Sequence, residues 1–342
     1  MEKGRRSQGR SEVATVLRNK NAPPNFAATR SLTPLDFLRF VFWEESAKAN
    51  RAHTLKSLAG LRSSFYSLIR ISRSGLSIRG RGCAWALSGD AGVIGVAAAR
   101  QRSGPQSWEI THLFAKPASH RQLPLLLDSV STAAAAKGGE RVFIRLSGDD
   151  PLIDVAKLSG YFPQVSEVLF QKRLEGGSSV PMAGHIGSSG PFRDKAPKDD
   201  HDLFRMYNAV TPPEIRFAVG MTLESWMASR ERPGGKSAEV VMEGEDGIAG
   251  LLRYSRRPSF GLIEAVTRPE RRHGLGPMVE MGLLGMSEGT EVYCLVPEYQ
   301  VELQSLIVDK GFRAVADYVT LVKSLTVKDR EKSRLRASVP SV

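Results

Sequence analysis

Two well-separated parts of the chain each contain a pair of short, mostly hydrophobic segments around a polar turn, the arrangement typical of β-hairpins. In the first half, residues 83–87 and 93–99 flank a turn of Ser, Gly and Asp. In the second half, residues 238–242 and 248–254 flank a similar turn of Gly, Glu and Asp. Short apolar runs on either side of such a turn predict an antiparallel pair of strands in each half.

The same succession of elements follows each hairpin. We expect a third strand, a helix with Pro in its first turn, a strand, a short helix that ends at a Gly, and a last strand. In the first half the expected ranges are 108–115, 124–136, 142–146, 151–158 and 166–172. In the second half they are 260–266, 277–286, 292–296, 301–309 and 316–323.

Residues that match between the halves keep a nearly constant spacing. Gly92 and Gly247 are 155 positions apart, Lys116 and Arg268 are 152 apart, and Gly160 and Gly311 are 151 apart. A spacing that drifts by only a few residues indicates a duplicated domain whose loops have changed length. We therefore interpret the chain as two tandem copies of one α/β domain. Each copy is expected to contain a mixed, mostly antiparallel, twisted sheet flanked by helices.

Composition divides the chain into five segments. A stretch rich in Gly, Ser and Pro separates the halves and is typical of a linker. The two ends lack hydrophobic periodicity and are expected to be basic tails without assigned structure. The expected segments are a tail over 1–30, a first domain over 31–174, a linker over 175–200, a second domain over 201–326 and a tail over 327–342.

The net charge of +12 does not by itself indicate a nucleic-acid-binding protein. Eight of the twelve excess positive charges lie in residues 1–30 and 328–342. A further basic stretch without acidic residues runs from Arg51 to Arg81. Aromatic residues suited to base stacking do not alternate with these charges, and no helix-turn-helix or RNP-like pattern is present. We therefore expect no specific nucleic-acid function.

Other classes are limited by the cysteines and by the apolar runs. Cys83 and Cys294 are the only two cysteines, so neither a disulfide framework nor a cysteine-based zinc site is expected. The histidines do not have metal-ligand spacing, and no metal is expected. The longest apolar run, residues 92–99, is much shorter than the ~20 residues of a membrane helix, and no signal-peptide pattern opens the sequence. We expect a cytoplasmic protein with no membrane contact.

The loop between the third strand and the helix of the second half is the strongest candidate for a ligand site. It contains Arg271, Arg272, His273, Gly274, Leu275 and Gly276, an R-x-x-G-x-G pattern. Glycines permit tight turns and close approach to an anion, and the free amides of the following helix favour phosphate. Val279 replaces a glycine of the dinucleotide-binding fingerprint, and no Gly-Lys-Ser/Thr motif occurs. A simple glycine turn that enters a helix, with arginines on the surface, is the alternative interpretation.

In this context the second half resembles the GNAT superfamily of acetyl-CoA-dependent N-acetyltransferases. The resemblance covers roughly residues 201–326 and rests on the strand ending at Val266, the Arg271-x-x-Gly274-x-Gly276 loop and the Gly311-Phe312 pair. The first half, roughly 31–174, looks like a diverged copy. The resemblance implies that an amine attacks the thioester of acetyl-CoA directly.

The resemblance also implies where coenzyme A would bind. The loop amides would hold its pyrophosphate, and the strand edge at Ala265 and Val266 would hydrogen-bond its pantetheine arm. In the first half Gln122 and Pro124 replace the two loop glycines. Gln122 does not easily adopt a positive φ and Pro124 lacks an amide donor, so we expect that copy not to bind coenzyme A in the manner of the family.

Two residues are candidates for proton transfer. Glu264, on the strand beside the expected thioester, is the candidate base, and an outward-facing carboxylate or an ion pair is its alternative role. The family often has a tyrosine, acting as the acid, four residues before the Gly-Phe pair, but Ile307 stands there. Tyr299 is the substitute candidate, with a structural role as its alternative. Cys294 is expected to be a core residue.

The sequence thus favours an N-acetyltransferase whose cosubstrate is acetyl-CoA and whose acceptor is a small-molecule or protein amine. A non-catalytic protein that keeps the fold for acyl-CoA sensing or as a scaffold is the alternative, and a polyanion-binding protein using its basic tails is a third. Two fused copies can form the pseudo-dimer that single copies reach by association, so we expect a monomer.

Overall fold

The computed structural model describes residues 27–33, 35–36, 40, 42–58, 80–90, 92–175, 191–258 and 260–325. Most of the expected N-terminal tail, residues 176–190 of the expected linker and all of the expected C-terminal tail lie outside these ranges. Within them, no helix is long and apolar enough to cross a membrane.

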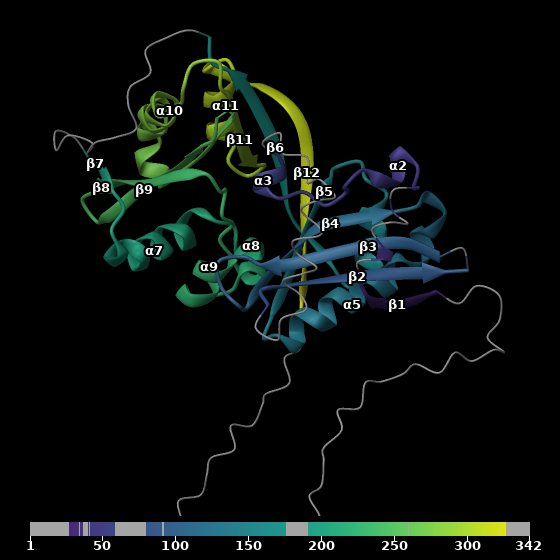
Figure 1. The fold of residues 1–342 in the computed structure, drawn as a ribbon. Helices are drawn as coiled ribbons and strands as arrows, with labels where there is room; N and C mark the ends of the chain where they lie inside the picture. The colour runs from purple at the N-terminus through teal and green to yellow at the C-terminus, as the bar shows by residue number, and fades with distance from the viewer. Residues whose placement is uncertain are drawn as a thin grey trace, which may run out of the picture.

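One continuous sheet of twelve strands runs through the described part of the chain (Figure 1). The strand order is β1-β2-β3-β4-β5-β12-β6-β11-β10-β9-β8-β7. The strands of the first half are β1 Ala28–Ser31, β2 Gly82–Gly89, β3 Gly92–Gln101, β4 Ser107–Ala115, β5 Arg141–Ser147 and β6 Phe162–Arg173. Those of the second half are β7 Phe192–Asp194, β8 Lys236–Gly244, β9 Gly247–Arg256, β10 Phe260–Thr267, β11 Glu291–Pro297 and β12 Arg313–Ser324.

Helices cover both faces of this sheet. In the first half they are α2 Glu45–Lys48, α3 Leu55–Leu58, η1 Pro117–Gln122, α5 Leu123–Ala136 and α6 Leu152–Leu158. In the second half they are η2 Pro197–Asp199, α7 Asp200–Val210, α8 Pro213–Val219, α9 Leu223–Ser229, η3 Pro269–Gly274, α10 Leu275–Leu284 and α11 Val301–Asp309. The apolar faces of α5 and α10 each bury a separate core against their own half of the sheet.

The last strand of each half lies in the sheet of the other half. Strand β6 pairs antiparallel with β11, and β12 pairs antiparallel with β5. The two exchanged strands also pair with each other at the centre of the sheet. Figure 1 shows these two long strands crossing the middle of the molecule. The sequence analysis expected each last strand to close its own copy, and this expectation is wrong.

The duplication itself is visible in the backbone. The hairpins β2–β3 and β8–β9, and every later element up to the last strands, occur twice in the same order, as the sequence predicts. Gly92 and Gly247 turn the two hairpins with φ of 98° and 101°. Gly160 and Gly311 follow the two short helices with φ of 76° and 82°. These angles are ones that L-residues with a side chain rarely adopt, so the matching glycines share a conformational requirement.

Two of the expected segment boundaries need correction. Residues expected in the N-terminal tail form β1, where Arg30 pairs with Ala86 of β2. Residues expected in the linker form β7 and η2, and Arg193 of β7 makes an ion pair of 2.6 Å with Asp199. Composition misplaced both boundaries because short edge strands have too few residues to show a period.

Candidate functional site

The neighbouring parallel strands β10 and β11 separate halfway along their length. They pair from Phe260–Glu291 to Ile263–Cys294, and no pairing continues beyond this point. On its other side β10 stays paired with β9 as far as Thr267. In the described part of the chain, the edge of β10 at Glu264, Ala265 and Val266 therefore faces a gap rather than a strand. Backbone donors and acceptors along such an edge are available to an extended ligand.

A cavity of about 290 Å³ lies beside this gap, between the two halves of the molecule. One wall is apolar and comes from helices α7–α9. The opposite wall is ionic and comes from both halves. The apolar wall includes Leu203, Met206, Tyr207, Ile215 and Trp226, and the ionic wall includes Arg102, Arg145, Glu167, Arg253 and Glu264.

A smaller cavity of about 150 Å³ leads from the gap toward the glycine loop. Ala265, Val266 and Tyr299 line both cavities, while Arg272 and Leu275 line only the smaller one. The separated strand ends therefore have open space on the loop side and on the side of the junction between the halves. A ligand and a second reactant can reach the same strand edge from these two sides.

The glycine loop enters α10 in a helical conformation. Gly274 has φ −75° and ψ −15°, so no left-handed turn is needed there. A Cβ at Gly274 would lie 2.4 Å from the sulfur of Met242, whereas a Cβ at Gly276 would meet only Leu306, at 4.0 Å. A side chain at Gly274 would therefore require the end of the Met242 side chain to move. Gly276 leaves open space at the first turn of α10, which fits an approaching anion, although the Leu275 amide already donates to Arg272 and Pro277 has no amide hydrogen.

The charged side chains of this loop are paired with carboxylates. Arg271 lies 3.1 Å from Glu245, and Arg272 lies 2.8 Å from Glu302. These pairs are half-exposed or exposed and therefore weak, so a phosphate can replace the carboxylates at small cost. His273 is exposed beside them. The loop thus brings two exchangeable guanidinium groups to the entrance of the smaller cavity.

Glu264 lies inside the larger cavity and is held there by an arginine. Its Oε2 atom is 3.0 Å from Nη1 of Arg253, whose Nε donates to Glu239. The Glu264 side chain is 29% exposed, so it remains accessible to a reactant. The ion pair that the sequence analysis gave as the alternative role of Glu264 is present, and the same carboxylate faces the cavity.

Two tyrosines lie near the separated strand ends. Tyr299 follows β11 and lines both cavities. Burial raises the pKa of Tyr299, although hydrogen bonds with Thr211 and Gln300 partly oppose this change. Tyr207 of α7 was missed in the sequence analysis. Its buried hydroxyl has no hydrogen-bond partner among the described residues, and burial raises its pKa.

Other candidates from the sequence lie in the core. Ile307, at the position where the family often has a tyrosine, is fully buried in α11. Cys294 is fully buried in β11, and burial raises the pKa of its thiol. Within the ranges that the structure describes, no group of three His, Cys, Asp or Glu side chains could hold a metal ion.

The equivalent gap in the first half is filled by the chain itself. Strands β4 and β5 pair only from Ser107 to Glu109 and then separate. Residues 50–53 lie between them: the amide of Arg51 donates to Leu113 of β4, at 2.9 Å, and the amide of His53 donates to Arg145 of β5, at 2.9 Å. These residues make the hydrogen bonds that a ligand would need.

Further contacts fix this inserted segment. The Asn50 side chain donates to the carbonyl of Thr111 and accepts from the amide of Leu113. Arg51 forms an ion pair of 2.8 Å with the buried Asp150. Gln122 has φ −97°, so the proposed difficulty with positive φ does not apply to this loop. The filled gap is the stronger physical reason why the first half does not present an open strand edge.

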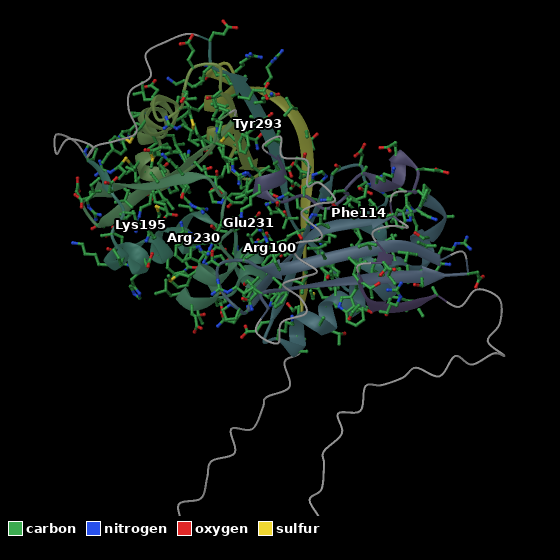
Figure 2. The ribbon with its side chains drawn as sticks, viewed as in Figure 1. Arg100, Phe114, Lys195, Arg230, Glu231 and Tyr293 are labelled. Atoms are coloured by element: carbon green, nitrogen blue, oxygen red, sulfur yellow. The ribbon has the colours of Figure 1, made fainter. Side chains whose placement is uncertain are left out.

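Buried ion pairs connect the two halves next to the larger cavity. Arg145 of β5 lies 2.7 Å from Glu167 of β6 and 2.7 Å from Glu231, which follows α9. Thr320 of β12 donates to Glu167 at 2.6 Å. Figure 2 shows Glu231, with Arg230 and Arg100, in the region where the halves meet. The network fixes the ionic wall of the cavity.

This arrangement is similar to solved structures of known class. A GCN5-related N-acetyltransferase from Sphaerobacter thermophilus superposes with a TM-score of 0.50 and 15% identity, over 87% of this chain and 95% of that chain. A tandem GNAT protein from the clavulanic acid biosynthesis pathway gives a TM-score of 0.48 and 12% identity, over 89% of this chain and 100% of that chain. No protein-family model and no curated protein sequence matches the chain.

The chain therefore has the fold of the GCN5-related N-acetyltransferases, as the sequence resemblance implied. Its twelve-stranded sheet is consistent with two such modules. The expected fold class, a mixed α/β sheet flanked by helices, is confirmed. At this level of identity the similarity defines the fold and leaves the activity to be argued from the site.

Proposed function

We propose that this protein is an N-acetyltransferase that uses acetyl-CoA and binds it only in the second half. The observation that carries this proposal is the open gap between β10 and β11, beside a helix whose first turn is left uncovered by Gly276. The first half has the same two strands but closes the gap with residues 50–53. One coenzyme A site per chain follows from this difference.

In the proposed complex the pantetheine arm lies along Ala265 and Val266. Its amides take the backbone hydrogen bonds that β11 does not make beyond Ile263. The pyrophosphate lies at the N-terminal turn of α10 and is neutralised by Arg271 and Arg272. This places the thioester in the larger cavity, near Glu264 and Tyr299.

The chemistry assigned to these side chains is one proton transfer each. Glu264 accepts a proton from the acceptor amine, whose nitrogen then attacks the thioester carbon. The carbon–sulfur bond breaks as the tetrahedral intermediate collapses, and Tyr299 donates a proton to the departing thiolate. Because burial raises the pKa of Tyr299, the phenol keeps its proton at neutral pH and is able to donate it.

One observation favours a second candidate, a non-catalytic acyl-CoA-binding protein. Ile307 occupies the position of the usual proton donor and is sealed in the core, so no side chain there reaches the cavity. The two candidates share the binding site and differ only in turnover. An acyl-CoA sensor would bind acetyl-CoA with the stoichiometry proposed here and would transfer no acetyl group to any amine.

Calorimetric titration with acetyl-CoA tests the shared part of the proposal. Wild type should bind one molecule per chain, and Gly276→Glu should abolish binding because the carboxylate occupies the anion position. An acidic residue in a first helical turn does not destabilise a helix, so the variant should stay folded. Leu125→Glu places the same charge in the first turn of α5, at an exposed position, and should bind normally. Absence of binding to wild type would refute both candidates.

A further inference from the structure

A third cavity, of about 690 Å³, lies where the two halves meet, and we call it the junction cavity. It is distinct from the cavity of about 290 Å³ at Glu264, for which we keep the name larger cavity. Lys56 and residues 103–106 line it from the first half, and residues 232–235 line it from the second half. Arg230 and Arg253 line this junction cavity and also the larger cavity of the proposed active site. The two cavities are therefore neighbours across these two guanidinium groups.

Three cations at the junction cavity have no carboxylate partner. Lys56 and Arg232 line the cavity, and Arg257 lies beside them. In the described part of the chain, none of the three has a carboxylate oxygen within ion-pair distance. The Arg257 guanidinium lies 5.3 Å from the ring centre of Phe260, and its buried Nε has no hydrogen-bond partner there.

The carboxylates near these cations are already engaged. Glu239 pairs with Arg230 at 2.5 Å and with Arg253 at 3.0 Å. Glu224 accepts a hydrogen bond of 2.5 Å from Gln106. Glu109 pairs with Arg100 at 2.6 Å. Glu109 and Glu239 are thus neutralised by other arginines, while Glu224, which lines the cavity and has no arginine partner among the described residues, offsets only one of the three positive charges.

Lys56 experiences this imbalance most strongly because it is half-buried. Burial lowers the pKa of Lys56, and the positive charges of Arg100, Arg257 and Arg232 lower it further, while the negative charge of Glu109 partly opposes this change. A bound anion would remove this repulsion and would favour the charged form of the lysine. The cluster therefore favours the binding of a negatively charged group.

The loop beside the cluster is shaped to admit these side chains. Gly234 and Gly235 have φ of 74° and 81°, which favours glycine at both positions. A Cβ at Gly234 would lie 2.5 Å from a guanidinium nitrogen of Arg257 and 2.8 Å from Cε of Lys56. The missing side chain allows a cation from each half to reach the same point.

The position of the cluster relative to Glu264 sets a length for the ligand. Glu264 pairs with Arg253 and Gly261 pairs with Arg256 along the β9–β10 ladder. At ~3.3 Å per residue, Gly261 is about 10 Å from Glu264. The amide of Arg257 donates to Phe260, the first residue of β10 and the neighbour of Gly261. The glycine loop at Pro269–Gly274 follows the opposite end of β10, so the junction cavity lies on the side away from the proposed pyrophosphate site.

From these observations, and resting on the proposed function, we infer that the acceptor is a small amine that also carries an anionic group of the phosphate or carboxylate type. The anionic group binds at Lys56 and Arg232 in the junction cavity, next to Arg257. The amine, about 10 Å away along β10, reaches Glu264 in the larger cavity.

Binding of inorganic phosphate tests the anion site without any need for turnover. Phosphate should bind to the full-length protein, and the double variant Lys56→Gln/Arg232→Gln should bind at least about tenfold more weakly. The matched control Lys198→Gln/Arg313→Gln removes two exposed cations elsewhere and should bind like wild type. Because the first variant relieves repulsion, its melting temperature without phosphate should equal or exceed that of wild type.

Acetyl transfer to three synthetic amines tests the acceptor assignment. 6-Aminohexyl phosphate has an extended length close to the required separation and should be acetylated faster than 6-aminohexanol, which lacks the phosphate. 2-Aminoethyl phosphate carries the same charge but is too short to span the distance, and should show no such advantage. The preference for 6-aminohexyl phosphate should disappear in Lys56→Gln/Arg232→Gln and persist in the control variant.

The phosphate-binding and acetyl-transfer experiments distinguish failure of this inference from failure of the proposed function. Wild type that binds no phosphate, or a preference that survives loss of the two cations, would overturn the inference. Equal acetylation of the phosphorylated and unphosphorylated hexyl amines would also overturn it. If acetyl-CoA itself does not bind, the proposed function fails instead, and that result is read from the calorimetric titration rather than from phosphate binding.

Discussion

Arg253 and Glu264 face each other across the β9–β10 ladder, and 3.0 Å separates the guanidinium from the carboxylate. The pair forms on the last stretch of β10 before the loop, where β11 has already turned away. A carboxyl group is thereby fixed at the edge of the open gap at one orientation. This is the condition that a general base needs in order to act on a bound amine.

Replacement of Glu264 by Gln should therefore lower the acetyl-transfer rate by about 10²- to 10⁴-fold, because the amide cannot accept the proton. Affinity for acetyl-CoA should not change, since Glu264 is assigned no contact with the pyrophosphate or pantetheine. Steady-state kinetics with calorimetry checks both values. Glu288→Gln, at an exposed position, is the control and should behave like wild type. A full rate in Glu264→Gln would leave the carboxylate with only its structural ion pair.

Tyr299 should set the alkaline limit of activity. Burial raises the pKa of its phenol above the ordinary value of 10.0, so the group stays protonated through the neutral range and loses its proton only above pH 10. The rate of wild type should therefore show no decline from this group below pH 10. Tyr299→Phe should reduce the rate at all pH values, while Tyr207→Phe should retain the wild-type pH profile. A decline shared by wild type and Tyr299→Phe would assign the alkaline limit to another group.

The segment that fills the gap in the first half should contribute measurably to stability. The Asn50 side chain makes hydrogen bonds with Thr111, at 2.9 Å, and with Leu113, at 2.8 Å. Asn50→Ala leaves those buried backbone groups without partners and should lower the free energy of unfolding by about 1–3 kcal/mol. Urea denaturation measures the change. The coenzyme A stoichiometry should stay at one, and a rise to two would show that the inserted segment is what prevents binding.

Acid should weaken the junction between the halves. Burial opposes ionisation of Glu231, but the positive charges of Arg145 and Arg102 outweigh it and hold the pKa of Glu231 well below its ordinary value of 4.5. Because the folded-state pKa is depressed, this stabilisation is complete above about pH 4.5 and is lost as the pH falls further. Thermal melts between pH 6 and pH 3 should show this loss, and Glu231→Gln should flatten it.

Removal of the cation from the same network should be more damaging. Arg145→Ala leaves Glu167 and Glu231 buried without their shared partner, and should lower the free energy of unfolding by about 3–5 kcal/mol at pH 7. Denaturation at pH 7 measures this value. A loss below about 1 kcal/mol would mean that water replaces the guanidinium.

Periodicity and repeat spacing were sufficient to predict most elements of both halves. They succeeded because the strands after each hairpin are short apolar runs bounded by turn residues, as in Val292–Val296 of β11, where all five residues are buried. The Gly92/Gly247 and Gly160/Gly311 pairs mark backbone positions with positive φ, so their spacing carries geometric information. A local sequence pattern is therefore sufficient to predict those elements whose conformation depends mainly on residues close in sequence.

The strand exchange could not be predicted in this way. Strands β6 and β12 have the same length and a similar pattern, and either could pair next to β5 or next to β11. Residues 50–53 have no period that distinguishes a strand-like insertion from a loop. Tyr207 was missed because an aromatic residue on an apolar helix face gives no signal that its hydroxyl enters a cavity. These features depend on contacts between distant parts of the chain.

The exchange of β6 and β12 has a consequence for what a single copy could be. One half on its own would present the place next to β5, or next to β11, as an unfilled edge, and could complete its sheet only with the last strand of another molecule. Such a protein would be a symmetric dimer whose existence depends on concentration. Joining the two copies in one polypeptide makes assembly intramolecular and allows the halves to differ. The first half can then fill the gap between its strands with residues 50–53, while the second half keeps the equivalent gap open for a ligand.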